Sequence, residues 1–292
     1  MWLFKIFRWP NLLIVGLTQY LLRYAVFATP FERAGLGFAL NEWEFTLLVA
    51  ATVLAAAGGY LINDLYDFEI DQVNKPEQVL IGRKISWKAA WGLYAGLHLA
   101  GAVIVGFLAW RLEQYYLLWF FPLMWYLLWL YSKRLKSMPF GGNLAVAVFC
   151  TAVVLLVWKS EQDPFELLEG DTAFRTQATL LFYSFFAFFS TLYRELVKDL
   201  EDMDGDKAYG CRTLPIVWGI SRAKSIGMAW GGLIGLGSLA WLYWAYDVLS
   251  GFAIGYMATL LYLTIYSLYF FAQSNTAPGF RRVSRQIKLL ML

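Results

Sequence analysis

The stretch WEFTLLVAATVLAAAGGYLINDLYDFEID, residues 43–71, joins a long apolar run to three aspartates and decides the fold. Its apolar part, Trp43–Ile62, has roughly the 20 residues that a helix needs to cross a bilayer. The spacing Asp64-x-x-Asp67-x-x-x-Asp71 follows directly. On a helix, offsets of 0, 3 and 7 residues fall within an arc of roughly 60°. The stretch therefore predicts a membrane-spanning helix that ends by aiming three carboxylates in nearly one direction.

The same acidic spacing returns later in the chain as Asp199-x-x-Asp202-x-x-x-Asp206. We call residues 64–71 the first box and residues 199–206 the second box. Like charges on one face repel one another, and at a helix C-terminus the macrodipole disfavours each carboxylate by up to about 1 kcal/mol. A divalent cation offsets both effects, and hard carboxylate oxygens suit Mg²⁺. Each box is therefore a candidate metal site.

The composition is that of an integral membrane protein. Hydrophobic residues make up 60% of the 292 residues, with 14 Trp and a mean hydropathy of +0.52, which is too apolar for an ordinary soluble domain. We predict eight membrane spans from the apolar segments of suitable length. They are Asn11–Thr29, Trp43–Ile62, Trp87–Trp110, Tyr115–Tyr131, Leu144–Trp158, Gln177–Tyr193, Ala223–Tyr246 and Phe252–Phe271.

The distribution of basic residues predicts the orientation. Most of the 24 Lys and Arg residues lie in loops on the side of the N-terminus. The opposite side has only Arg33, Arg111, Lys159 and Arg175. By the positive-inside rule the N-terminus and both boxes are cytoplasmic, in what we expect to be a prokaryotic inner membrane. The net charge of +3 then reflects topology, and we expect no nucleic-acid partner.

Counting crossings gives two halves of similar layout within a single domain, residues 1–292. The second and sixth predicted helices both run from outside to inside, and each ends in an acidic box. We therefore predict two parallel four-helix halves, about 1–140 and 141–272. A C-terminal helix at 280–292 is too short to cross a bilayer, and it is either an interfacial helix or the start of a ninth span.

Several ionisable residues lie outside the aspartate triplets. Arg23 falls within a span, where it has either a structural partner or a catalytic role. His98 lies deep in the third span and is predicted to pack against a neighbouring helix or hydrogen-bond to it. On a helical wheel Glu195 joins the face of Asp199. The remaining acids of the boxes are assigned to a solvated face; they are Glu69, Glu201 and Asp204.

Further motifs join the two boxes in one family resemblance. They are Arg8 with Asn11, Asn74-Lys75-Pro76, Tyr131-Ser132-x-x-Leu135-Lys136, Gly142-Asn143, Lys198-Asp199-x-x-Asp202-x-x-Gly205-Asp206 and Gly210-x-Arg212-Thr213-Leu214-Pro215. Together with the boxes, the set resembles the UbiA superfamily of intramembrane prenyltransferases, whose first motif is N-D-x-x-D-x-x-x-D. It is most similar to the digeranylgeranylglyceryl phosphate synthase branch. The resemblance covers nearly the whole chain, although the family typically has nine spans.

The resemblance implies both a fold and an activity. The fold would be an all-α membrane bundle of eight to nine helices around a central cavity. The activity would be Mg²⁺-dependent transfer of a prenyl group, geranylgeranyl in this branch, from an isoprenoid diphosphate to a lipophilic acceptor, with release of pyrophosphate. The acceptor favoured by the branch is a prenylglyceryl phosphate, and an aromatic acceptor of the quinone or chlorophyll type is the alternative.

The site residues follow from the same resemblance. Two Mg²⁺ would be held by Asn63, Asp64, Asp67, Asp71, Asp199, Asp202 and Asp206. Substrate contacts would come from Asn11, Asn63, Lys75, Arg83, Lys84, Tyr131, Lys136, Asn143, Tyr193 and Lys198. Aromatic side chains that could shield an allylic cation are Tyr66, Phe185, Phe186 and Phe189, together with Tyr193.

Two simpler interpretations compete with these assignments. The basic residues of the loops, Arg83, Lys84 and Lys136 among them, are equally explained by the positive-inside rule. The boxes themselves could serve a cation-coupled transporter. Transport, however, favours carboxylates near the bilayer midplane and inverted repeats, whereas these boxes are predicted at one membrane face in parallel repeats. An enzyme is the interpretation that we carry forward.

Overall fold

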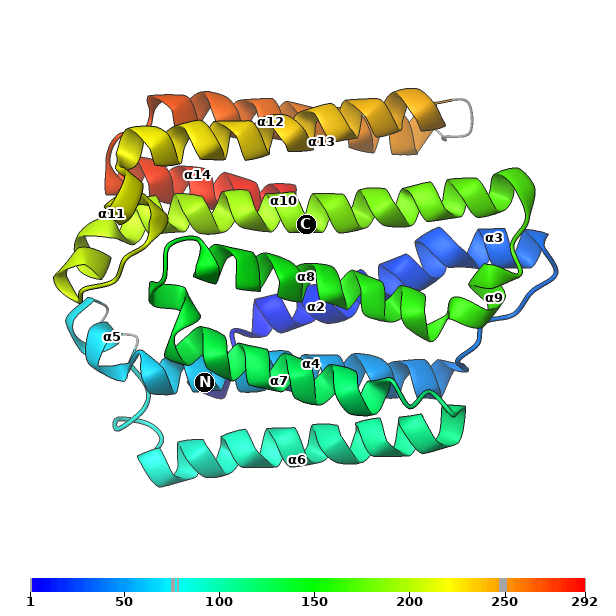
Figure 1. Ribbon diagram of the computed structural model, residues 1–292, viewed down its shortest axis with the longest axis horizontal. Helices are drawn as coiled ribbons and strands as arrows, with labels where there is room; N and C mark the ends of the chain where they lie inside the picture. The colour runs from blue at the N-terminus through cyan, green and yellow to red at the C-terminus, as the bar shows by residue number, and fades with distance from the viewer. Residues whose placement is uncertain (1, 75–76, 78, 247–250, 292) are drawn as a thin grey trace. The chain divides into compact units, whose positions relative to one another are not determined.

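The computed structural model describes residues 2–74, 77, 79–246 and 251–291, and this part of the chain is helical and contains no β-strand (Figure 1). The first elements are α1 (Trp2–Ile6), α2 (Trp9–Leu21), the π-helix η1 (Leu22–Phe27), α3 (Ala28–Arg33), α4 (Glu42–Tyr66), α5 (Phe68–Asn74), α6 (Trp87–Leu112), α7 (Leu117–Lys133) and the 3₁₀ turn η3 (Leu135–Ser137). The remainder are α8 (Gly141–Ser160), α9 (Gln162–Glu166), α10 (Gly170–Ala208), α11 (Leu214–Trp218), α12 (Ile220–Ala245), α13 (Gly251–Gln273) and α14 (Ala277–Leu290).

The helices agree with the predicted spans. Among the described residues, seven helical stretches are long and apolar enough to cross a membrane. The first of them, Trp9–Arg33, continues through the π-helix and is longer than the predicted Asn11–Thr29. The predicted span Tyr115–Tyr131 corresponds to α7, which has 17 residues. The all-helical membrane fold predicted from hydropathy is thus confirmed.

The helix that carries the first box begins and ends at identifiable residues. Asn41 caps α4 by accepting a hydrogen bond from the Glu44 backbone at 3.0 Å, while the Glu44 carboxylate accepts one from the Asn41 backbone. At the other end α4 stops at Tyr66, and a new helix starts after Asp67. The prediction that the first box lies on one uninterrupted helix is therefore wrong. The second box lies within the continuous helix α10, as predicted.

The contacts of the chain divide it into two compact units, Met1–Leu135 with Ala152–Ala178, and Lys136–Thr151 with Thr179–Leu292. The predicted boundary at about residue 140 differs from this division because α8 and α10 each contribute to both units. In the first unit α4 packs against α2, α6 and α7. A Cβ atom at Gly58 would lie 2.7 Å from the ring of His98, so the glycine lets that ring approach α4. His98 is therefore a packing residue, as predicted.

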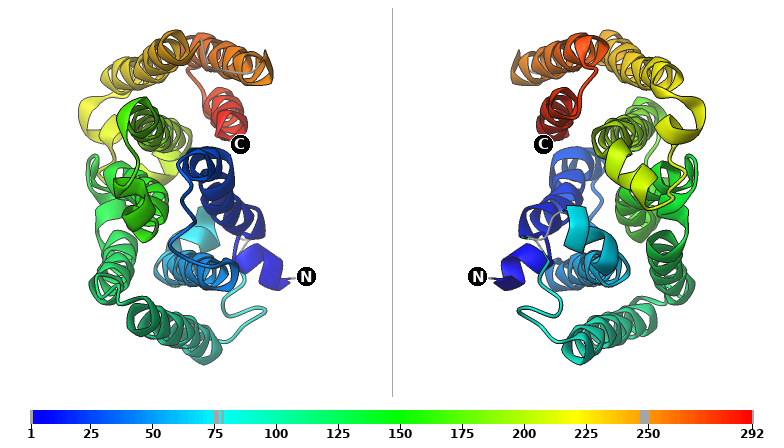
Figure 2. Two further views of the ribbon diagram at one scale, coloured as in Figure 1. Left: turned by 90° about the vertical axis from the view of Figure 1, so that its right-hand side faces the viewer. Right: turned by 90° about the vertical axis from the view of Figure 1, so that its left-hand side faces the viewer.

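In the second unit α10, α12, α13 and α14 share one core, and α14 lies beside α13 (Figures 1 and 2). The apolar face of α14 contributes Phe280, Val283 and Ile287 to this core, and all three are buried. An interfacial helix would need that face for the lipid. The interfacial alternative for the C-terminal helix is therefore wrong.

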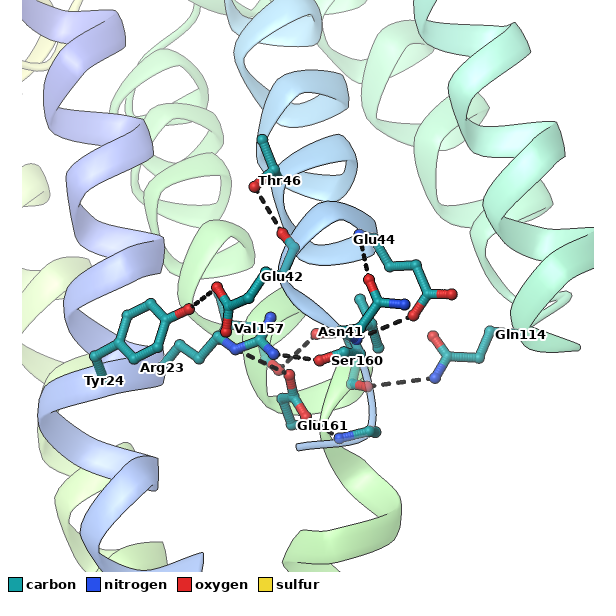
Figure 3. A network of polar contacts seen from close by, with 12 residues as sticks. Arg23, Tyr24, Asn41, Glu42, Glu44, Thr46, Gln114, Val157, Ser160 and Glu161 are labelled. Atoms are coloured by element: carbon teal, nitrogen blue, oxygen red, sulfur yellow. Dashed lines mark hydrogen bonds and ion pairs between the residues drawn. The ribbon is translucent and has the colours of Figure 1, made fainter. Parts of the chain in front are cut away.

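Arg23 lies in a buried polar network near Asn41, at the N-terminal end of α4 (Figure 3). The first box begins at the opposite end of the same helix. Its guanidinium donates to the Leu40 carbonyl, and its Nε lies 3.6 Å from Glu161 Oε1, with both side chains fully buried. The rings of Phe38 and Phe45 lie 4.3 and 4.2 Å from the guanidinium carbon. Of the two roles considered for Arg23, the structural partner is the one observed.

This network predicts a pH dependence of stability. Burial raises the pKa of Glu161 to about 7, from an ordinary value of 4.5, although Arg23 and the Ala39 backbone act in the opposite direction. The folded protein therefore holds this proton more tightly than the unfolded chain. The stabilisation is complete below about pH 4.5 and is lost as the pH rises through about 7. We expect the melting temperature in detergent to fall between pH 5 and pH 8 for the wild type, and to fall less for Glu161→Gln. An equal fall in the two proteins would contradict this.

Candidate functional site

The first box is tied to the start of α2 by an ion pair. Nη2 of Arg8 lies 2.9 Å from Asp64 Oδ1, and the guanidinium carbon lies 4.9 Å from the centre of the Tyr60 ring. Arg8 has a left-handed backbone, with φ of 48°, at the position just before α2, and this conformation is uncommon for a residue other than glycine. Both partners of the ion pair keep some exposure to solvent, 43% for Arg8 and 24% for Asp64. The guanidinium of Arg8 is thus held at Asp64, the first carboxylate of the box.

The break in the helix gives the second aspartate of this box a distinct position. Asp67 lies between α4 and α5, and its backbone carbonyl accepts a hydrogen bond from the Asp71 backbone at 2.8 Å. Its carboxylate accepts a hydrogen bond from Asn63 Nδ2 at 2.7 Å. Because the amide nitrogen of Asn63 is used in this way, its amide oxygen is the atom that could face a cation. Asp64, Asp67 and Asp71 are all half-buried.

The second box repeats the pairing of an amide with an aspartate. Asn143, in the first turn of α8, donates a hydrogen bond to Asp199 Oδ2 at 2.8 Å. One turn before Asp199, the buried carboxylate of Glu195 accepts from Arg194 at 2.7 Å and from Lys198 at 2.9 Å. Glu195 therefore holds two basic side chains one turn before Asp199.

The acids assigned to a solvated face divide into two groups. Glu69 and Asp204 are exposed, as predicted. Glu201 is not solvated, because its carboxylate receives Arg281 of α14 at 2.7 Å and is only 14% exposed. The sequence could not reveal this contact, since it depends on where α14 packs.

The predicted basic contacts lie mostly in turns. Arg83 and Lys84 are exposed in the turn between α5 and α6, where Gly82 packs against Phe68, the residue that follows Asp67. This turn therefore lies beside the first box. Lys75 lies outside the described residues. Asn11 is half-buried in the first turn of α2.

Two motif segments meet in the second unit. Lys136 belongs to the 3₁₀ turn η3, and the backbone of Arg212 donates to the carbonyl of Ser137 at 2.9 Å in the same turn. This backbone hydrogen bond links the motif that starts at Gly210 to the residue that follows the motif Tyr131–Lys136. Tyr131 and Lys136 are both half-buried.

The aromatic assignments agree less well with the structure. Tyr193 is fully buried in the core of the second unit, with its ring centre 5.4 Å from that of Phe271. Phe186 and Phe189 pack on the same core, and the ring of Phe185 fills the space above Gly237 of α12. These contacts assign the four residues to core packing and give no support to a substrate role. Tyr66 is exposed and accepts a hydrogen bond from Trp129 at 3.1 Å.

Two residues with contacts at the boxes have no role in the prediction from the sequence. Arg8 enters that prediction only as a motif match, and Arg194 does not enter it. The available signal was position, because each is an ionisable residue at or near the end of a span and within reach of a carboxylate.

The aspartates of the boxes form a donor set that could hold magnesium only together with a substrate. Among the described residues, no three or more His, Cys, Asp or Glu side chains are grouped so that they could hold a metal by themselves. Magnesium usually binds proteins through one or two carboxylates and takes its other ligands from substrate phosphates and water. The half-buried aspartates, two of them oriented by asparagines, fit a magnesium diphosphate of this kind.

Comparison with known proteins identifies relatives over most of the chain. The sequence pattern of the UbiA prenyltransferase family matches residues 21–291. The digeranylgeranylglyceryl phosphate synthase of Thermococcus sibiricus is 30% identical over 83% of this chain and 79% of its own length. The enzyme of the same name from Methanosphaera stadtmanae is 30% identical over 86% of this chain and 85% of its own length.

Solved structures show the same fold. A structure reported for digeranylgeranylglyceryl phosphate synthase matches with a TM-score of 0.67 and 23% identity, over 99% of this chain and 93% of that one. A UbiA homologue from Archaeoglobus fulgidus, bound to GPP and Mg²⁺, matches with a TM-score of 0.59 and 15% identity, over 100% of this chain and 97% of that one.

Proposed function

Because the chain belongs to the UbiA prenyltransferase family, we propose that it transfers a prenyl group from an isoprenoid diphosphate to a prenylglyceryl phosphate and releases pyrophosphate. The observation that carries this proposal is the repeated acidic box, in which a half-buried aspartate receives an asparagine amide in each copy. The relatives named as digeranylgeranylglyceryl phosphate synthases support this acceptor and a geranylgeranyl donor. Family membership also decides against the transporter.

The first task of the site is to hold a polyanionic substrate at the membrane surface. We assign Asp64, Asp67 and Asp71 to one magnesium ion and Asp199, Asp202 and Asp206 to a second. Magnesium on these carboxylates would neutralise the pyrophosphate that leaves when the allylic C–O bond breaks. The Archaeoglobus homologue bound to GPP and Mg²⁺ supports this choice of metal.

The side chains around the boxes then have separate roles. Asn63 and Asn143 fix the orientation of Asp67 and Asp199 through their amide hydrogen bonds. Arg8 and Lys198 carry the positive charges that we assign to the diphosphate oxygens, because charge-assisted hydrogen bonds to phosphate are strong. In the structure Arg8 is paired with Asp64, and Lys198 is paired with Glu195. An arriving diphosphate would compete for these cations.

We place the N-terminus and both boxes on the cytoplasmic side of the membrane. The excess of basic residues in the loops on that side supports this orientation. Water-soluble pyrophosphate would then leave into the cytoplasm, while both prenyl chains stay in the lipid.

Product analysis tests the proposal. Purified protein with Mg²⁺ would be given geranyl, farnesyl or geranylgeranyl diphosphate, each with a prenylglyceryl phosphate or with an aromatic acceptor such as homogentisate or 4-hydroxybenzoate. We expect mass spectrometry to find an ether of geranylgeranyl and the glyceryl phosphate, and chelation with EDTA to abolish it. Prenylated aromatic product alone would replace the proposed acceptor by the aromatic one. Absence of any transfer would overturn the function.

A further inference from the structure

The helix α14 carries basic residues along one face and no acidic residue. Its sequence, APGFRRVSRQIKLL, contains Arg281, Arg282, Arg285 and Lys288 and neither Asp nor Glu. The opposite face, with Phe280, Val283, Ile287 and Leu290, is buried in the second unit. Residues 281, 285 and 288 have the helical spacing that puts them on one side. We call these three residues the basic ladder.

The ladder starts at the level of the second box. Arg281 lies 2.7 Å from the carboxylate of Glu201, and this contact, with a further contribution from Asp202, raises the pKa of the guanidinium above its ordinary value. Glu201 and Asp202 both belong to the last part of α10. The first cation of the ladder therefore lies next to the carboxylates that we assign to metal binding.

From there the ladder runs away from the box along the bundle. Leu290, near the end of α14, packs with Met257 and Leu260 of α13, whereas Phe280, near its start, packs with Phe271. Since α13 ends at Gln273, α14 returns alongside it for roughly 20 Å. Arg285 and Lys288 lie about 6 and 10 Å further along the helix than Arg281. The positive-inside rule explains cations in loops and at the ends of spans, but not cations at this depth.

A charge at this depth needs an anionic partner or water, because facing hydrocarbon is costly. Arg285 is exposed, and among the described residues it has neither a hydrogen bond nor an ion pair. Glu201 is already paired to Arg281, and α14 carries no acid, so Arg285 alone is enough to leave the ladder with a net positive charge. An anion of a lipid-soluble molecule fits this position, since its headgroup can lie at the ladder while its chains stay in the membrane.

We propose that Arg285 and Lys288 bind the phosphate of the acceptor lipid. This inference rests on the proposed function and deepens it, because it assigns the acceptor phosphate to α14 and leaves the donor diphosphate to the boxes. A phosphomonoester carries nearly two negative charges at neutral pH, which complements two cations at i and i+3 on one helical face. A free phosphate would satisfy the charges equally well, so the test must compare lipids that differ only in this group.

The experiment compares two acceptors, geranylgeranylglyceryl phosphate and geranylgeranylglycerol, with the same donor. For the wild type we expect kcat/KM to favour the phosphate by about tenfold or more, as for charged hydrogen bonds. In Arg285→Gln/Lys288→Gln this preference should largely disappear while the KM of geranylgeranyl diphosphate stays within about twofold. Arg222→Gln, which removes an exposed cation from the first turn of α12, should keep the preference.

The conservative variant Arg285→Lys should retain most of the preference, which separates charge from packing. An unchanged preference in the double variant would overturn the proposal. A rise in donor KM with no change in acceptor preference would also overturn it, since the ladder would then serve the diphosphate. If the wild type makes no product with any acceptor, the proposed function itself fails, and that result is distinct from the other two.

Discussion

Replacing Asp67 or Asp202 with asparagine is expected to lower prenyl transfer by about a thousandfold or more, because neutralising a leaving pyrophosphate supplies several kcal/mol of transition-state stabilisation. Asparagine keeps the size of the side chain and removes its charge, so the protein should remain folded in detergent. The half-buried position of both carboxylates favours this, since neither is locked in a hydrophobic core. Turnover is measured by pyrophosphate release and by product mass at saturating Mg²⁺.

Each box offers its own control. Glu69 and Asp204 lie within the two boxes but are exposed, so Glu69→Gln and Asp204→Asn should keep the rate within about twofold. Near-normal turnover in Asp67→Asn and Asp202→Asn would remove the metal assignment. Equal loss in the control variants would point instead to the net charge of the segment.

Replacing Asn143 with alanine is expected to lower activity at subsaturating Mg²⁺ by about ten- to a hundredfold, which is the range for groups that orient a metal ligand. The amide holds one oxygen of Asp199 at 2.8 Å, and alanine would leave that carboxylate free to turn. We therefore expect the Mg²⁺ concentration for half-maximal activity to rise, with little change in the rate at saturating metal.

Thr151 provides the matched control for this change. It lies on the same helix, α8, and within the described part of the chain its hydroxyl bonds only to the Ala147 carbonyl one turn earlier. Thr151→Ala should leave the Mg²⁺ requirement unchanged. A loss of activity in Asn143→Ala that saturating Mg²⁺ does not relieve would mean that the amide contacts substrate, as the sequence motif first suggested.

The parts of the site that sequence reasoning identified depend on local spacing. Hydropathy finds the spans because each must cover the bilayer thickness by itself. The acidic boxes stand out because carboxylates are rare beside apolar runs. Arg23 could also be recognised as a buried charge, but its partner Glu161 lies far along the chain, so only the fold reveals the pair.

Other features depend on packing and could not be read from spacing. No proline or glycine lies within residues 60–71, so the local sequence does not mark the interruption at Asp67. A helical wheel assigns Glu201 to solvent because it shows which side of the helix a residue faces, but not which other helix covers that side. Tyr193 adjoins the second box in sequence, yet its side chain lies on the α10 face that meets α13.

We propose that both boxes bind the same diphosphate, and a double-mutant cycle on binding distinguishes this claim from two independent sites. Affinity for geranylgeranyl thiodiphosphate, an unreactive donor analogue, would be measured with Mg²⁺ for the wild type, Asp67→Asn, Asp202→Asn and the double variant. We expect each single change to weaken binding by about tenfold or more, and the double change to cost less than the two combined, with a coupling beyond about 1 kcal/mol. Strictly additive losses, or a box whose loss leaves binding unchanged, would contradict the claim.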